Sequence, residues 1–168
     1  VHDDIHNGAT PRQAVRVGPI AIEARFRAAD VAGWQTGYAF DFTRGVPNAA
    51  DDTVGQRKEF VASSTALTGL YEQLGKEPLA AEQKALLGTA TQAYSRFLEI
   101  DATIVAGYRR GTKESIAASN ELASGESLEQ FGIAATATSD LAKSIADTGT
   151  RAADEELTSM AAGRRLTW

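Results

Sequence analysis

The chain has 168 residues, so we expect residues 1–168 to form one domain of ordinary size with a buried core. Its formal net charge of -5 argues against a general nucleic-acid binder, which needs a basic surface to release counterions. The sequence contains no cysteine, which excludes disulfides and thiolate metal sites and leaves the cellular compartment undecided.

Helical patterns separated by short breaks cover most of the chain. Residues 1–18 are polar, and we expect an irregular lead-in there, with Pro19 in the first turn of the first helix. The expected helices span residues 19–44, 51–74, 79–122 and 128–165. No stretch shows the alternation of a β-strand. The sequence therefore predicts an all-α domain, an antiparallel up-down-up-down bundle of four long helices.

Two of these boundaries depend on single residues. Gly111 lies within the third predicted helix, and we expect it to interrupt or bend that helix. Ser127 and Gln130 are three residues apart and have the form of a capping box, which predicts that the fourth helix begins directly after Ser127. The fourth helix carries few large side chains at its seam positions, so a neighbouring helix could approach it closely.

The most aromatic stretch, residues 25–44, belongs to the first helix and has two adjacent stripes. One stripe mixes rings and charges and holds Arg27, Asp30, Trp34, Tyr38 and Asp41. The other has the small and apolar pattern of a helix–helix seam and holds Phe26, Ala29, Gly33, Thr36 and Phe40. The spacing of Gly33 and Gly37 suggests close approach of a neighbouring helix.

The third predicted helix has one polar residue, Asp101, in an otherwise apolar seam. A buried carboxylate must be paired, protonated or hydrated, because unpaired burial costs several kcal/mol. Arg57 and Arg27 are the candidate partners. Two interpretations stay open: an internal ion pair that fixes helix register, and a polar pocket inside or between bundles.

The sequence gives little support to catalysis. His2 and His6 are the only histidines and lie in the lead-in, where a solvated tail is favoured over a metal or haem site. There is no Glu-x-x-His pair, nucleophile elbow or phosphate loop. We therefore expect no enzyme, no cofactor and no metal. The candidate ligand-binding residues are Arg27, Asp30, Trp34, Tyr38, Arg57 and Asp101, although an aromatic stripe at this spacing is more often packing.

The two ends of the chain suggest a membrane nearby. No stretch reaches the roughly 18–20 apolar residues of a membrane-spanning helix, no signal peptide is visible, and the first residue is Val1 rather than Met. We therefore expect a fragment of a longer protein. The last residues, GRRLTW, resemble the anchor of a membrane span, with a frayed helix end as the alternative. In the predicted bundle the first and last helices leave at the same end.

Four segments carry a family resemblance: AADVAGWQTGYAFDFTRG, FVASSTALTGLYEQL, FLEIDATIVAGYRRGT and ASNELASGESLEQF. They resemble the four-helix-bundle sensor region of bacterial methyl-accepting chemotaxis receptors. The likeness is closest to actinobacterial forms, which share the stretch Gly-Trp-Gln-Thr-x-Tyr-Ala-Phe-Asp, here residues 33–41.

This resemblance implies an extracytoplasmic domain at the cell membrane, anchored by flanking transmembrane helices that are absent from this sequence. It also implies a homodimer, a small-molecule ligand bound in the upper bundle or at the dimer interface, and signal transduction through the last helix. The family's arginine motif for amino-acid ligands does not align here, so the resemblance implies no ligand identity. A helical interaction or adaptor domain without a small ligand is the alternative, and a bundle enzyme or haem carrier is a third hypothesis.

Overall fold

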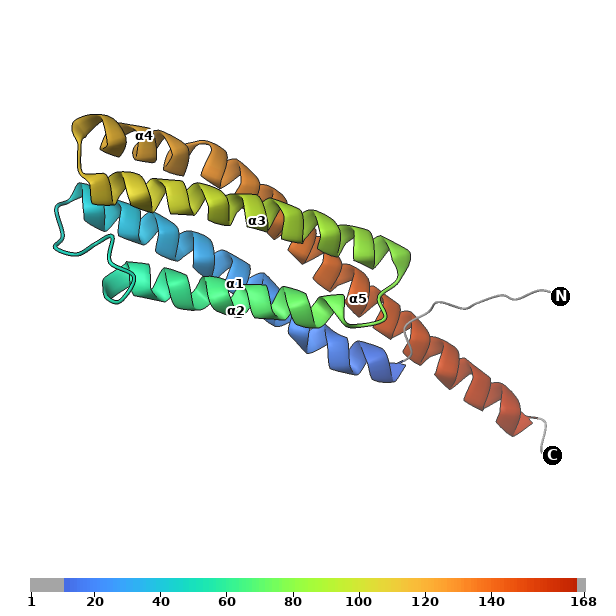
Figure 1. The fold of residues 1–168 in the computed structure, drawn as a ribbon. Coiled ribbons are helices and arrows are strands. Elements are labelled where there is room, and N and C mark those ends of the chain that lie inside the picture. The colour runs from blue at the N-terminus through green and yellow to red at the C-terminus, as the bar shows by residue number, and fades with distance from the viewer. Residues whose placement is uncertain (1–10, 166–168) are drawn as a thin grey trace.

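The computed structural model describes residues 11–165, which form five helices and no β-strand (Figure 1). The helices are α1 (Pro11–Thr43), α2 (Gly55–Gly75), α3 (Ala81–Arg110), α4 (Lys113–Ser124) and α5 (Glu126–Arg165). The all-α prediction is therefore confirmed. His2, His6 and Trp168, on which the histidine-site and membrane-anchor predictions depend, lie outside the described residues.

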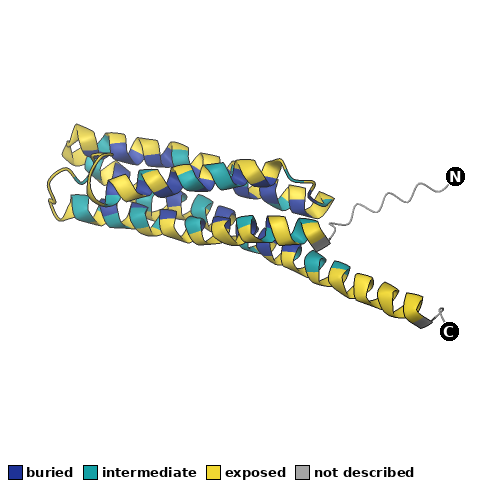
Figure 2. Cartoon of the chain, turned by 90° about the horizontal axis from the view of Figure 1, so that it is seen from below, coloured by how far each residue is buried: buried dark blue, intermediate teal, exposed yellow. Residues whose placement is uncertain are grey.

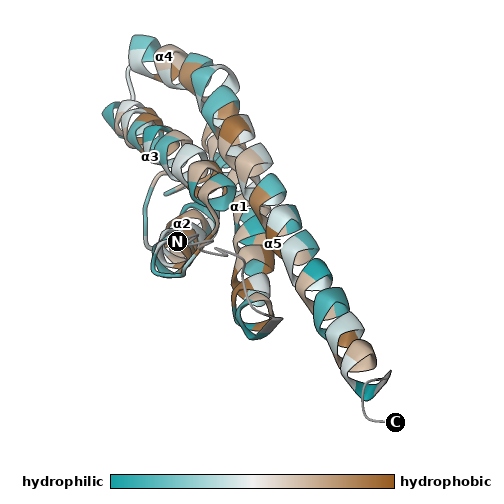
Figure 3. Cartoon of the chain, turned by 90° about the vertical axis from the view of Figure 1, so that its right-hand side faces the viewer, coloured by the Kyte–Doolittle hydropathy of each residue, from teal (hydrophilic) through white to brown (hydrophobic). Residues whose placement is uncertain are grey.

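The helices lie side by side in an elongated rod. In Figure 1, α1 and α3 run in one direction, and α2 and the α4–α5 pair run in the other. α1 packs between α2 and α5, and α3 packs against α4 and α5, whereas α2 and α3 have few close backbone approaches (Figure 3). We call the end with the α1–α2 loop (residues 44–54) the loop end, and the opposite end, with the α2–α3 loop (residues 76–80), the tail end.

Over residues 11–165 the rod has four arms: α1, α2, α3, and α4 followed by α5. The third and fourth arms divide at Gly111, which corrects the prediction of one helix over residues 79–122. Gly111 has a φ of 71°, in the left-handed region that favours glycine, and it ends α3. The chain then reverses, because Thr112 caps α4 through a reciprocal pair of hydrogen bonds with Ser115, each 3.1 Å. Ser115 also donates to the carbonyl of Gly107, 2.8 Å away, which holds α4 against α3.

The fourth arm is therefore α4 followed by α5, with a break at Gly125. The prediction of a helix start at residue 128, capped by Ser127, is wrong, because α5 begins at Glu126. Ser127 is fully buried instead, and its hydroxyl donates to the side-chain carbonyl of Gln35, 2.7 Å away. Ser127 therefore forms a buried contact with α1, although its local sequence pattern predicts a helix cap.

The first helix begins at Pro11, so residues 11–18 are helical and the predicted irregular lead-in is wrong for them. Pro19 lies inside α1 on the exposed side. The carbonyl that loses its helical donor at a proline lies one turn back, on the same exposed side.

The α1–α2 loop also runs further than predicted, since α2 begins at Gly55 rather than near residue 51. Asp51 stabilises that loop by accepting hydrogen bonds from the backbone N–H and hydroxyl of Thr53.

The buried face of α1 is not the predicted seam, because its residues lie one or two positions before the seam residues. The buried residues recur at helical spacing and are Val17, Ala21, Ala24, Ala28, Val31, Gln35 and Tyr38. The predicted seam residues Phe26 and Phe40 are each 58% exposed, and Ala29, Gly33 and Thr36 are exposed as well. That prediction is wrong because α1 packs closely on α5 through small side chains rather than through its phenylalanines.

Close packing of α1 on α5 is explained by alanine and glycine. Ala134, Ala137 and Ala142 of α5 are buried, and a Cβ placed on Gly149 would lie 2.6 Å from the Cβ of Ala14. The predicted close approach along the last helix is confirmed. At Gly37 a Cβ would meet the side chain of Gln56, whereas at Gly33 it would meet nothing within 4 Å. The expectation of a close approach therefore holds for Gly37 only.

Beyond the packed rod, α5 continues as a projecting helix (Figures 1 and 2). Residues 151–164 are all exposed except Ala152, which is partly buried. Among the described residues, no helix is long and apolar enough to span a bilayer. α1 begins at the same tail end from which α5 projects.

Candidate functional site

The loop end contains a buried polar network centred on Asp101 of α3. Its Oδ1 accepts hydrogen bonds from the Gln35 amide at 2.9 Å and the Tyr38 hydroxyl at 2.5 Å, both from α1. Its Oδ2 accepts from Arg57 Nη1 of α2 at 2.6 Å. One carboxylate therefore joins three helices.

Burial of this charge is tolerated because every partner is in place. Asp101 is only 3% exposed, and the side chain of Arg57 only 8%. The guanidinium also lies over the rings of Tyr38 and Phe60, at 4.9 and 4.7 Å from their centroids. Within residues 11–165 no buried side-chain nitrogen or oxygen lacks a hydrogen-bond partner. A saturated network of this kind fixes helix register, and removal of one member is costly.

The network extends from Arg57 to the α1–α2 loop. Arg57 Nε donates to Asp52 Oδ1 at 2.8 Å, and Asp52 Oδ2 lies 3.1 Å from Arg109 Nη2 of α3. Arg109 Nε also donates to the carbonyl of Ala50 at 3.0 Å. Asp52 and Arg109 are each about half exposed, so the buried ion pair connects to solvent-accessible charges at this end.

The network also reaches α5. Gln35 donates its amide N–H to Asp101 and accepts the Ser127 hydroxyl on its carbonyl oxygen, so both ends of the amide are used. These two bonds determine how the amide is oriented. The side chain of Gln35 therefore links α5 to the carboxylate on α3.

Charge and burial determine the protonation states of the network. Burial, with the adjacent Asp101 carboxylate, raises the pKa of Tyr38 far above its usual value, so this hydroxyl stays a donor. Burial opposes the charge on Arg57, but its contacts with Asp101 and Asp52 outweigh burial and raise its pKa. The hydrogen bond from Arg57 lowers the pKa of Asp52. Tyr38 therefore acts as a hydrogen-bond donor and Arg57 as a cation in this network.

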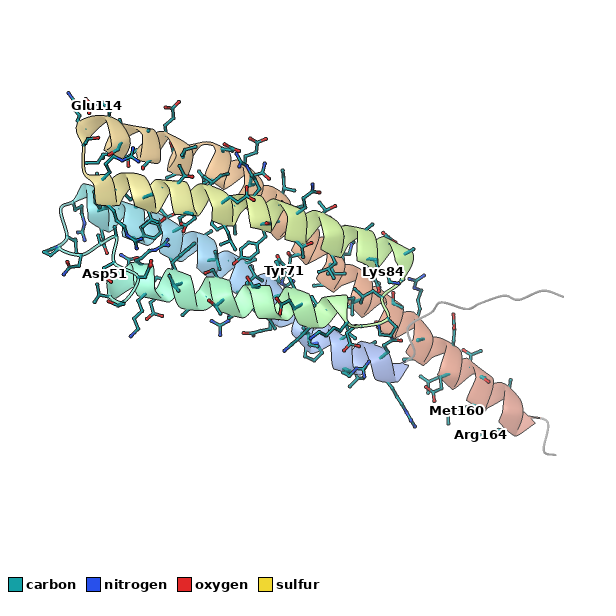
Figure 4. The ribbon with its side chains drawn as sticks, in the orientation of Figure 1. Asp51, Tyr71, Lys84, Glu114, Met160 and Arg164 are labelled. Atoms are coloured by element: carbon teal, nitrogen blue, oxygen red, sulfur yellow. The ribbon has the colours of Figure 1, made fainter. Side chains whose placement is uncertain are left out.

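Two hollows lie beside the network at the loop end. A hollow of about 550 Å³ lies under the α1–α2 loop, where Asp51 is seen in Figure 4. Its lining residues are Phe42, Val46, Asn48, Ala49, Ala50, Asp51, Asp52, Thr53, Tyr108 and Arg109. A smaller one of about 280 Å³ lies between α1 and the α4–α5 break and is lined in part by Gln35 and Tyr108. Asp101 lines neither hollow. Of its direct partners only Gln35 lines one, the smaller, and the larger is lined by Asp52 and Arg109 from the outer part of the network.

Three of the six predicted site residues come together. Tyr38, Arg57 and Asp101 share the network, and Arg57 rather than Arg27 is the partner of Asp101. Arg27 instead forms surface ion pairs with Glu23 and Asp30. Arg27 and Asp30 are therefore outside the network. Trp34 is outside it as well, since it is partly buried and packs against the core.

Sequence reasoning missed four members of the network: Gln35, Asp52, Arg109 and Ser127. Gln35 precedes Tyr38 by three positions on the buried face of α1, so the correct choice of seam would have identified it. Asp52 and Arg109 gave no such signal, because only the path of the α1–α2 loop brings them together. Among the described residues, no group of three or more potential metal ligands is arranged to hold a metal ion.

Comparisons with known proteins give no family assignment. No protein-family model matches the chain, no curated protein matches it, and no solved structure matches it. The function therefore has to be inferred from the arrangement of side chains and from the chemoreceptor-like segments of the sequence.

Proposed function

We propose that this chain is the extracytoplasmic sensor domain of a transmembrane chemotaxis receptor, an up-down-up-down four-helix bundle that binds a small molecule at its loop end. The observation that carries the proposal is the position of the polar network. It joins α1, α2, α3 and α5 at one end of the rod, while α1 begins and α5 ends at the other. A molecule bound at the loop end therefore acts on helices that run toward the tail end.

The α1–α5 contact is suited to small relative movements. Each helix buries three alanines, which reduces the number of large side chains that interlock across the contact. A ligand shifts such a contact only if it binds one arrangement of α1 and α5 more tightly than another. The bond between Gln35 and Ser127 connects the two helices beside the smaller hollow, and its geometry depends on their relative position. This arrangement supports the proposal that the signal passes through α5 toward a membrane anchor.

The hollow under the α1–α2 loop is the proposed ligand site. Asp52 and Arg109 present opposite charges on its wall, and Phe42 stacks on Tyr108 with ring centroids 4.2 Å apart. Small-molecule sites typically combine an apolar or aromatic surface with a small number of polar groups that converge on it. The occupant we infer is a small polar metabolite.

A homodimer is part of the proposal, and the exposed stripe of α1 supports it. The stripe has heptad spacing and comprises Val15, Pro19, Ile22, Phe26, Ala29, Gly33, Thr36 and Phe40, all exposed. Two such stripes can pack as a parallel helix pair. In that pairing Arg25 of one copy faces the partner's Asp30, whereas an antiparallel pairing places acidic residues together. Parallel packing also puts both copies' tail ends on one side, as a common membrane requires.

The alternative, a helical adaptor domain without a small ligand, is supported by exposed apolar residues in the projecting part of α5. Leu157 and Met160 are 65% and 54% exposed there, on one face of the helix. A partner helix could cover them. The two functions differ in whether any small molecule stabilises the fold.

A thermal-shift screen of amino acids, organic acids and other metabolites tests the sensor function. A true ligand at a hundredfold excess over its Kd stabilises the fold by about 2.7 kcal/mol. Arg109→Gln should abolish that shift, because Arg109 lines the hollow. Arg110→Gln is the matched control, since Arg110 is the exposed neighbour and lines neither hollow at the loop end. A shift that survives Arg109→Gln would refute the site, and a protein that no metabolite stabilises would favour the adaptor.

Sedimentation velocity tests the dimer separately. Phe26→Lys places a charge in the middle of the exposed stripe and should dissociate a dimer without lowering the melting temperature of the monomer. Arg25→Asp combined with Asp30→Arg preserves charge complementarity and should retain the dimer. If Phe26→Lys sediments like the unaltered chain, α1 is not the interface.

A further inference from the structure

The side of the rod between α2 and α3 contains a groove near the tail end, away from the polar network. Its volume is about 530 Å³, within the 300–1,000 Å³ range of small-molecule sites. Tyr71 and Lys84, from opposite walls, are seen there in Figure 4. The groove exists because α2 and α3 are the neighbouring arms that approach each other least.

Two tyrosine rings and three leucines make the groove apolar. Tyr71 and Tyr94 lie edge to face, with ring centroids 5.6 Å apart. Their hydroxyls are already bonded to core groups: Tyr71 to the Thr138 hydroxyl at 2.6 Å, and Tyr94 to the Ser64 carbonyl at 2.9 Å. Because the hydroxyls are bonded in the core, the small part of each residue that reaches the groove, 5% of Tyr71 and 4% of Tyr94, offers carbon surface rather than hydrogen-bonding groups. Leu79, Leu87 and Leu98 complete this surface.

Glycines keep the groove open. Gly75 of α2 and Gly88 of α3 line it, and a Cβ added at either would meet nothing within 4 Å. A helix-interior glycine costs about 1 kcal/mol relative to alanine, and no close helix approach explains Gly88. A larger residue at either position would occupy the space that a bound molecule needs.

The charges around the groove balance. Glu77 is paired with Arg16, whose Nη2 lies 2.5 Å from the carboxylate. Glu72 on α2 and Lys84 on α3 carry opposite charges on opposite walls, and neither forms an ion pair within residues 11–165. An anion is drawn to one wall and repelled by the other, and so is a cation. The charges therefore favour an occupant without net charge, and the apolar walls disfavour a zwitterion, whose charged groups would lose their hydration there.

We propose that this groove is a binding site for a neutral, apolar small molecule, whose aromatic or aliphatic body lies on the rings of Tyr71 and Tyr94. A polar uncharged end of that molecule fits at the mouth, between Glu72 and Lys84. The site is separate from the hollow at the loop end and does not depend on the sensor function. Because Tyr71 is bonded to Thr138, the occupant contacts a side chain held by α5.

Isothermal titration calorimetry of the full chain with three matched probes tests the ligand class. The probes share a naphthalene ring and are 2-naphthylmethanol, 2-naphthoate and 2-naphthylmethylamine. We expect the neutral alcohol to bind roughly tenfold more tightly than either ion, with a negative heat-capacity change from apolar burial. Tighter binding of the acid or the amine would overturn the neutral class, and the absence of binding by all three would overturn the site.

Gly88→Leu tests the location. Leucine should fill the groove and raise the Kd of the alcohol by tenfold or more, while the helix is stabilised by the loss of glycine. Gly132→Leu is the matched control, because Gly132 is an exposed glycine inside α5 that does not line the groove, and a Cβ added there would meet nothing within 4 Å. Unchanged affinity in Gly88→Leu would place the molecule elsewhere. Arg109→Gln should leave this binding intact, which separates the groove from the proposed sensor site.

Discussion

The two halves of the rod bury their interiors by different means. Toward the loop end, the core includes a charged pair, an amide and hydroxyls joined by hydrogen bonds around Asp101. Toward the tail end, it is mainly apolar, with side chains such as Val17, Leu74, Leu79 and Ile145, and Gln83 is a buried polar side chain there, bonded to Ser144 and Thr148 of α5. The first arrangement is directional and depends on all its members, whereas the second is a sum of small contacts that tolerates adjustment.

Each half has a different role because of this contrast. The polar half specifies which residues of the helices face one another, since a shift of one residue would leave buried charges unpaired. The apolar half leaves room for a groove, because no directional bond requires α2 and α3 to approach closely there. A chain of aromatic contacts from Tyr71 through Tyr94, Phe97 and Phe60 to Tyr38 runs between the halves.

The largest effect should come from Asp101→Ala. This substitution removes the buried carboxylate from the Arg57 guanidinium, which keeps only the half-exposed Asp52, and leaves the Tyr38 hydroxyl without an acceptor. We expect a loss of about 3–5 kcal/mol in the free energy of unfolding, measured by urea denaturation. Asp101→Leu combined with Arg57→Met removes both charges and should cost less than Asp101→Ala alone. A single-variant loss below about 1 kcal/mol would show that the network is not a unit.

Leu74→Ala should have a smaller but substantial effect in the apolar half. Leu74 is fully buried, so the substitution removes apolar contact and leaves a cavity. The expected loss is about 2–5 kcal/mol, toward the lower end because the groove side can relax. Leu74→Met is the control, because its volume is similar and it should cost less than about 1.5 kcal/mol. An equal loss in both variants would contradict a packing origin.

The four tyrosines of the chain, which line both halves, should ionise only as the fold is lost. Burial raises the pKa of Tyr38, Tyr71, Tyr94 and Tyr108. Raised pKa values stabilise the fold fully below the unfolded value near pH ~10, and this stabilisation declines as pH rises above it. Tyrosinate absorbance and far-UV circular dichroism should therefore change together. Tyrosinate formation in a protein that keeps its full helical signal would contradict this.

The smallest effect should follow Arg96→Ala. Arg96 bridges Glu99 and Glu126 on the surface between α3 and α5, and the group is exposed. Exposed ion pairs are screened by solvent and lose side-chain entropy. We expect the urea midpoint to stay within experimental error. A clear loss would show that this surface contact helps to fix the fourth arm on α3.

The sequence allowed the polar centre to be predicted but not all of its members. Asp101 was recognisable because a carboxylate interrupts an apolar seam, and Arg57 was one of two candidate partners. The choice between Arg57 and Arg27 depended on which face of α1 is buried, and the sequence favoured the wrong one. Phe26 and Phe40 made the outer stripe look like the core, whereas the small residues of the inner stripe allow α1 and α5 to approach.

The sequence by itself determined that this protein is helical, where most of its breaks occur, and that one buried carboxylate needs a partner. Those properties follow from local periodicity, glycine and proline positions, and the cost of an unpaired charge. Only the tertiary structure decided that Gly111 reverses the chain, so that α4 starts the fourth arm rather than extending the third. Whether a left-handed glycine bends or reverses a helix depends on what the next segment packs against, here the Gly107 turn of α3.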